Sequence, residues 1–353
     1  MLTKAFVWNV VIIFVVTFLL LEGSFRLYHQ ISPVFIFPDN SDNRFRNKPF
    51  DYDYDDFRLN SRGFKDIEPQ DPKPQGSIRI AGIGDSFVYG VVPYKHNFLT
   101  LLEEKLNSIK SERYEVLNMG IPRTSPREYY SVLVKEALPL KPDVALICIF
   151  IGNDFIEVSR KPVLHHSFVI SAARYVFDWL RYVEPTKAYS VRSHYVDEAP
   201  SFSEAYFLEI ELMRAEVYDQ SNRMLSERLP RVMTWVDEIK TVCENNGIQL
   251  FIMLMPDELQ VNTELQNRVQ EKLEVDKDKK DKLDFDRPNK LLADELRMRN
   301  LRYLDLLEPF RLRTRDVPLY KPRDTHWNIA GNQLAADLLY DFLHAAIDER
   351  QGT

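Results

Sequence analysis

A serine that directly follows an apolar segment is the first candidate for chemistry in this chain. Ser86 stands in Gly84-Asp85-Ser86-Phe87, after the short apolar run 78–83 and before a helical region. There its hydroxyl would lie at a sheet edge and its backbone N–H near a helix N-terminus, where a developing oxyanion is stabilised. Alone, the motif is weak evidence, because a strand-exit turn with Asp or Ser as a helix cap explains it equally well.

A partner for this serine occurs close to the C-terminus. A serine nucleophile needs a general base, and the base needs a group that holds its tautomer. Asp324 and His326 are two residues apart, and residues i and i+2 of an extended segment point the same way. The alternative is a loop aspartate beside a packed histidine. We predict that Ser86, His326 and Asp324 form a catalytic triad.

Two polar clusters follow other apolar segments. Residues 118–120 (Asn-Met-Gly) and 152–154 (Gly-Asn-Asp) each end such a segment. Gly120 would let a backbone N–H approach a substrate with no side chain in the way, and Asn153 could offer a neutral donor to an oxyanion. Each cluster alone is more often a turn, but their occurrence on successive strands favours a shared site.

The elements that must position these residues alternate along the chain. Apolar runs predict strands over 78–83, 114–117, 144–151, 249–255 and 302–306, and periodic segments predict helices over 98–109, 127–137, 231–245, 290–300 and 329–347. This order predicts a flavodoxin-like three-layer α/β/α sandwich with a central parallel sheet of about five strands. The run 144–151 is apolar throughout, which is typical of a central strand. Ligands bind at the carboxyl ends of such strands, where the polar clusters stand.

The remaining segments define the domain organisation. Residues 76–350 form the main domain, interrupted at about 161–228 by an aromatic-rich helical insertion with helices over 171–183 and 205–227, which could cap the site. Residues 26–75 are interpreted as a connector and lead-in. The acidic run 51–56 within it does not match a calcium-binding loop, because the required glycine and final acidic ligand are absent.

The N-terminal residues 1–25 are predicted to be a transmembrane signal-anchor. Ala5 to Leu21 is nearly all apolar, close to the shortest length that spans a bilayer. The residues after it make a poor cleavage site, although a cleaved signal stays open as the alternative. Lys4 on the cytoplasmic side implies a single-pass protein with an extracytoplasmic catalytic domain.

Composition excludes several other classes. The 353 residues carry a net charge of −7 with no concentrated basic face, which argues against nucleic acid as a partner. Two cysteines exclude a disulfide framework. His165-His166 is an isolated pair and no phosphate-cradling glycine loop is seen, so no metal or diffusible cofactor is expected. The oligomeric state is not determined by the sequence.

Together these motifs resemble the SGNH (GDSL-like) hydrolase superfamily. The resemblance covers about residues 63–339 and rests on its four blocks in order, which here are Gly84-Asp85-Ser86, Gly120, Gly152-Asn153-Asp154, and Asp324 with His326. It implies a Ser86 nucleophile with His326 and Asp324, and an oxyanion hole of the Ser86 and Gly120 N–H groups and the Asn153 amide. The lead-in 59–64 is similar to that of bacterial membrane-anchored members.

One spacing departs from the commonest family pattern. The acid and base are arranged Asp-x-His rather than Asp-x-x-His, and Trp327 follows. This resembles a bacterial subgroup that includes proteins linked to acetylation of exported polysaccharides. The expected function is a serine esterase at the cell envelope that deacylates a surface glycan or a lipid ester. The alternatives are an O-acyltransferase using the same triad and, more remotely, a non-catalytic glycan-binding scaffold.

Overall fold

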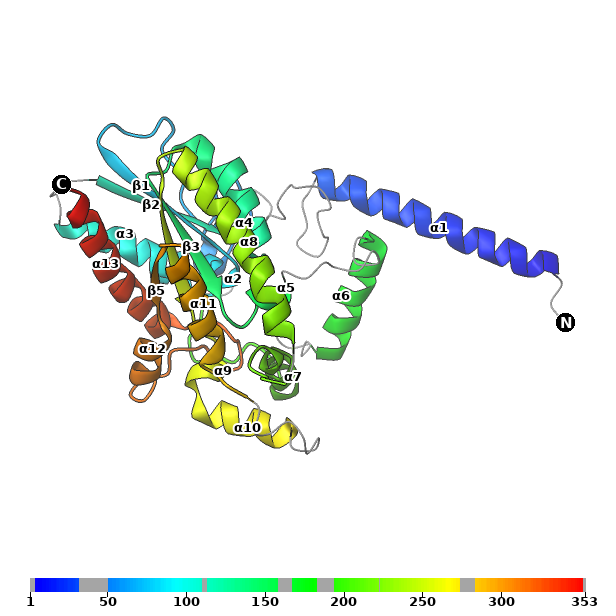
Figure 1. The fold of residues 1–353 in the computed structure, drawn as a ribbon. Helices are drawn as coiled ribbons and strands as arrows, with labels where there is room; N and C mark the ends of the chain where they lie inside the picture. Colours follow the sequence, from blue (N-terminus) through cyan, green and yellow to red (C-terminus); the bar gives the residue numbers. More distant parts are fainter. Residues whose placement is uncertain are drawn as a thin grey trace.

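A parallel five-stranded sheet forms the centre of the protein (Figure 1). The computed structural model describes residues 4–31, 50–109, 113–157, 167–182, 194–221, 223–273 and 283–351. The strands are β1 Ser77–Gly84, β2 Arg113–Gly120, β3 Val144–Phe150, β4 Gln249–Met255 and β5 Arg302–Asp305. They pair in parallel in the order β2-β1-β3-β4-β5, which is the flavodoxin-like order. The predicted α/β fold is confirmed.

Helices cover both faces of this sheet. Figure 1 shows α3 and α13 on one side and α4 and α8 on the other. The helices of the main domain are α2 Ser86–Tyr89, α3 Phe98–Ile109, α4 Pro126–Val132 with a π turn Leu133–Ala137, α5 Asp154–Glu157, α8 Met224–Asn245, α9 Glu258–Val261, α10 Thr263–Leu273, α11 Arg287–Met298, α12 Leu307–Arg313 and α13 Ile329–Gln351. Short 3₁₀ turns are formed by Tyr54–Asp56, Tyr94–His96 and Leu138–Leu140.

Strand β3 lies at the middle of the sheet and is buried along its whole length. Alternate side chains such as Leu146 and Cys148 pack into one core with α3 and α13, while Ile147 and Ile149 pack into the other core with α4 and α8. A strand covered on both faces needs apolar residues at every position. The prediction of a central strand from its unbroken apolar run is therefore confirmed.

The predicted helix 205–227 is broken in the structure. Helix α7 ends at Arg214 (Glu204–Arg214), a 3₁₀ turn Ala215–Val217 follows, and α8 then begins at Met224. At this break the buried Tyr218 donates a hydrogen bond to Asp257 Oδ2 at 3.2 Å. A tertiary contact therefore sets the break, which helical periodicity alone does not reveal.

The second half of the expected connector packs onto the main domain. Residues 32–49 lie outside the described residues, but from residue 50 onward the chain is placed. Lys65 is fully buried and donates to the carbonyl oxygens of Gly90 and Val92, while Asp66 Oδ2 accepts from the Asn118 N–H at 2.7 Å. The lead-in thus braces both the loop after α2 and the end of β2.

Helix α1 (Lys4–Ile31) extends away from the rest of the protein (Figure 1). An 18-residue window within Phe6–Ile31 has a mean hydropathy of 2.3 and none of it is buried, so the helix is long and apolar enough to cross a membrane. A signal sequence would show the same properties. Near its end, Glu22 accepts hydrogen bonds from the Phe168 and Val169 N–H groups at 3.0 Å and so caps α6 (Phe168–Tyr182).

Candidate active site

Ser86 is the first residue of α2, directly after β1. The preceding Asp85 caps this short helix, because its side chain accepts a hydrogen bond from the Phe87 N–H at 2.9 Å. The cap turns the chain at the strand end and leaves the Ser86 hydroxyl facing the loop before α13. The motif therefore contains both a helix cap and a serine directed at a possible base. Asp85 caps the helix, and Ser86 beside it points toward a histidine.

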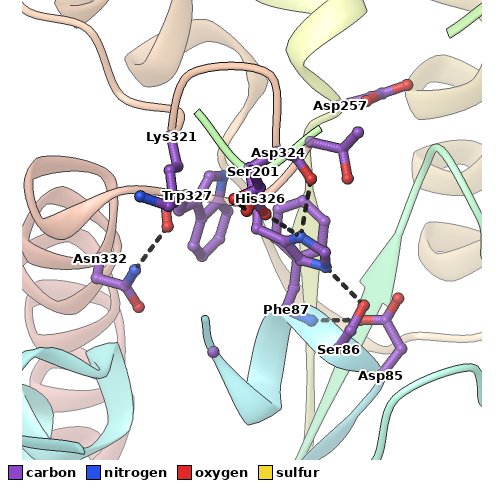
Figure 2. A network of polar contacts seen from close by, with 12 residues as sticks. Asp85, Ser86, Phe87, Ser201, Asp257, Lys321, Asp324, His326, Trp327 and Asn332 are labelled. Atoms are coloured by element: carbon purple, nitrogen blue, oxygen red, sulfur yellow. Dashed lines mark hydrogen bonds and ion pairs between the residues drawn. The ribbon is translucent and has the colours of Figure 1, made fainter. Parts of the chain in front are cut away.

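That histidine is His326, which lies 240 residues further along the chain. Its Nε2 is 2.8 Å from Ser86 Oγ, and its Nδ1 is 2.8 Å from Asp324 Oδ1 (Figure 2). Asp324 is buried, and its side chain is only 4% exposed. The structure thus brings the three predicted residues into one line of hydrogen bonds, within the 2.6–3.2 Å reach typical of a nucleophile and its base.

The Asp-x-His loop has an unusual backbone that its neighbours hold in place. Arg323 and Thr325 on either side of Asp324 have φ values of 48° and 75°, in the left-handed region that non-glycine residues seldom adopt. Trp327 is buried against the Phe87 ring at 5.3 Å between centroids, edge to face. This contact ties the loop after His326 to the helix that carries Ser86.

Gly120 lies at the end of β2, opposite Gly84 in the register of the sheet. A Cβ atom there would overlap the backbone of Val88 and Tyr89, so the glycine lets α2 sit against the strand end. Its N–H donates to Asn118 Oδ1 at 3.0 Å. The role of oxyanion donor expected for Gly120 stays a prediction, and that N–H already has a partner in this structure.

We expect Gly120→Ala to destabilise the protein, because the added methyl group would meet backbone rather than a flexible side chain. The expected loss is about 3 kcal/mol or more of unfolding free energy, the upper part of the range for overpacking. Thermal unfolding of the full-length protein in detergent measures it. Gly23→Ala is the matched control, since nothing lies within 4 Å of a Cβ there. Equal midpoints for the two variants would contradict this role.

Asn153 follows β3 and lies beside the carboxylate of Asp85. Burial raises the pKa of Asp85 to about 6. The groups that act in the opposite direction on this pKa are the Phe87 N–H, His326, Arg214 and the side chain of Asn153. The Asn153 side chain therefore lies close to the Asp85 carboxylate, which directly precedes Ser86. The next residue is structural, because Asp154 accepts from the Tyr129 hydroxyl and the Phe150 N–H.

A buried ionic cluster behind the loop was missed by the sequence analysis. Arg214 of α7 lies 3.1 Å from Asp257 Oδ1 and 3.2 Å from Glu211 Oε1, and it donates to Thr325 Oγ1 at 3.3 Å. Burial raises the pKa of both carboxyls, and Arg214 acts in the opposite direction. In the part of the chain that the structure describes, no group of three or more His, Cys, Asp or Glu side chains is arranged to hold a metal ion.

Ser201 was also missed. It lies in the insertion, yet its hydroxyl donates a hydrogen bond to Asp324 Oδ2 (Figure 2). Serine is common in loops, and no motif marks this one. Only the folded chain places residues 201 and 324 side by side.

Part of the chain matches the model of a known protein family. Residues 212–352 match the family model described as the SGNH hydrolase-like domain of the acetyltransferase AlgX. The match includes the Asp-x-His loop and strands β4 and β5. No curated protein matches the chain significantly.

Solved structures with similar folds include three ester hydrolases. The acetyl xylan esterase AlAXEase is 13% identical (75% of this chain, 98% of that chain, TM-score 0.41). Axe2, an acetylxylan esterase from Geobacillus stearothermophilus, is 12% identical (76% and 94%, TM-score 0.40). A lipase/acylhydrolase from Enterococcus faecalis is 15% identical (75% and 94%, TM-score 0.38).

Two observations bear on the chemistry of this chain, the family model and the geometry of the site. The model covers residues 212–352, which include Asp324 and His326. Ser86 lies outside this match, at the hydrogen-bond distance from His326 that a serine hydrolase requires. Residues 212–352 are similar to the SGNH hydrolase-like domain, and the site has the arrangement of an SGNH-type esterase or acyltransferase.

Proposed function

We propose that Ser86 is the nucleophile of an acyl-transfer reaction in which His326 is the general base and Asp324 holds the imidazole. The observation that carries this proposal is the continuous line of contacts from Ser86 Oγ through both ring nitrogens to Asp324 Oδ1, at 2.8 Å and 2.8 Å. Such a line allows Nδ1–H to donate to the carboxylate, which leaves Nε2 unprotonated and able to take the serine proton.

The reaction follows from this proton path. Ser86 Oγ bonds to the ester carbonyl carbon as its proton passes to His326 Nε2, and the carbonyl oxygen becomes an oxyanion. The C–O bond to the alcohol then breaks, and the departing oxygen takes that proton from the imidazolium. Water, or the hydroxyl of an acceptor, gives its proton to Nε2 and attacks the acyl-enzyme. The acid or the new ester leaves, and the proton returns to Ser86 Oγ.

The oxyanion needs donors fixed before it forms. The Ser86 N–H at the start of α2 and the Asn153 amide are the proposed donors, together with the Gly120 N–H. The Gly120 N–H donates to Asn118 Oδ1. It would therefore have to exchange partners when the tetrahedral intermediate forms.

The proposed substrate is an O-acylated surface glycan or a lipid ester at the cell envelope. The support is α1, whose length and apolarity suit a single-pass anchor. The catalytic domain is proposed to lie on the extracytoplasmic side. The anchor would keep the enzyme beside acyl groups attached to the envelope. Acyl transfer to a sugar hydroxyl is the second candidate, because the matching family model is named for an acetyltransferase.

A fluorophosphonate probe tests the nucleophile. We expect it to label the full-length protein in detergent at a single site, the tryptic peptide containing Ser86, because only an activated serine attacks phosphorus rapidly. Prior heat unfolding should abolish labelling. Labelling of a different serine, or no labelling of folded protein, would overturn the assignment.

A product assay then separates the two candidates. The protein is incubated with a short-chain aryl ester, with and without a glycan acceptor, and free acid is compared with acylated glycan. Release of free acid at the same rate in both reactions supports the esterase. Transfer in excess of hydrolysis supports the acyltransferase.

A further inference from the structure

The helical insertion contacts the triad through the segment directly before α7. Ser201 and Phe202 run beside the Asp-x-His loop: the Ser201 N–H donates to the Pro322 oxygen at 3.2 Å, and the Phe202 N–H donates to the Arg323 oxygen at 3.0 Å. These two backbone hydrogen bonds hold Ser201 beside the loop independently of its side chain. The chain then enters α7, which Ser203 caps by accepting from the Tyr206 N–H.

The Ser201 hydroxyl completes the surroundings of the Asp324 carboxylate. Asp324 Oδ1 faces His326 Nδ1 at 2.8 Å, and Oδ2 accepts the hydrogen bond from Ser201 Oγ (Figure 2). A carboxylate this deeply buried needs a donor for each oxygen. With Oδ2 held by the hydroxyl, the carboxylate cannot rotate away, and Oδ1 stays directed at the imidazole.

The backbone on either side of Asp324 also depends on the insertion. Arg323 and Thr325 adopt positive φ values, and such conformations persist only where surrounding contacts hold them. Phe202 binds the Arg323 carbonyl, and Arg214 at the end of α7 donates to Thr325 Oγ1 at 3.3 Å. Both left-handed residues are thus held by groups that the insertion supplies.

We infer that Ser201 is a positioning residue of the catalytic triad, and that the insertion serves to hold the Asp-x-His loop. This rests on the proposed function of Ser86, His326 and Asp324. Ser201 does not touch the reacting atoms. It acts through Asp324, by fixing the orientation of the carboxylate that orients His326.

Ser201→Ala in the full-length protein tests this role. We expect kcat for a short-chain aryl ester to fall about 10- to 100-fold, the cost of slight misplacement of a catalytic group, while KM stays within about twofold because no substrate contact is lost. The pH profile of kcat/KM should change as well, because the Asp324 carboxylate loses the hydrogen-bond donor to its Oδ2.

The controls separate positioning from folding. Ser201→Thr keeps a hydroxyl and should restore most of kcat and the original pH profile. Ser203→Ala removes a nearby hydroxyl that only caps α7, so it should leave both unchanged. The other titratable groups near the pair are Asp85, which faces His326, and Tyr195 and Glu258, which face Asp324; they are the same in all three variants.

Three outcomes are decisive. A fall in kcat with Ser201→Ala, restored by Ser201→Thr, supports the inference. Unchanged kcat and pH profile in Ser201→Ala, with Ser86 labelled by the fluorophosphonate in the same preparation, overturns the inference but leaves the proposed function standing. Failure of the probe to label Ser86 in the wild-type protein overturns both.

Discussion

Replacement of Ser86 by alanine is expected to abolish hydrolysis of a short-chain aryl ester by the full-length protein in detergent. Ser86 Oγ lies 2.8 Å from His326 Nε2, and no other hydroxyl is placed to donate to that nitrogen among the described hydrogen bonds. Without it the proton path has no nucleophile at its end. Loss of such a group lowers kcat by on the order of 10⁶-fold, so the rate should fall to the background of the assay.

The size of this effect requires a control for folding and contamination. Ser108→Ala removes an exposed hydroxyl that bonds only the Lys105 carbonyl of its own helix, α3, and should retain wild-type activity after the same purification. Ser86→Ala removes only one oxygen atom, so the thermal unfolding midpoint of this variant should stay near that of the wild type. Full activity in Ser86→Ala would refute the mechanism.

Replacement of Arg214 by methionine is expected to cause the largest loss of stability. The guanidinium is buried between Glu211 and Asp257 and also packs on the Phe150 ring, 5.0 Å from its centroid. Methionine has a similar length but leaves two carboxyl groups buried without their cation. Breaking a buried ion pair by removing one partner costs about 3–5 kcal/mol.

This loss should depend on pH in a defined direction. Burial already raises the pKa of Glu211 and Asp257 in the folded protein, and Arg214 opposes the shift. Without Arg214 both carboxyls bind protons more tightly when folded than when unfolded. Stability of the variant is then greatest at acidic pH and falls as pH rises through the folded-state pKa values.

Unfolding at several pH values, in urea and detergent, measures both effects. Arg299→Met is the matched control, because Arg299 pairs with Asp237 and Glu295 at the surface with 24% of its side chain exposed. Exposed pairs contribute about 0–1 kcal/mol, so this control should lose little. If the two methionine variants unfolded at the same urea concentration, the Arg214 cluster would not contribute to stability as described.

The elements predicted from sequence agree with the structure where their signal is local. The strand at 249–255 and the helix at 98–109 have the predicted bounds, since alternation of apolar runs with amphipathic segments reports burial directly. The prediction was wrong at 205–227, where Tyr218 turns the chain toward Asp257. Periodicity cannot show a break that a distant partner imposes.

The sequence by itself determined the fold class and the residue types of the site, because each strand end carries its own polar signature: Ser86 after β1, Asn153 after β3, and the Asp324–His326 pair before α13. Only the tertiary structure decided how they are held. Ser201 and Arg214 contact Asp324 and Thr325 across more than a hundred residues of chain. Such contacts arise from packing of remote segments, which leaves no spacing or motif in the sequence.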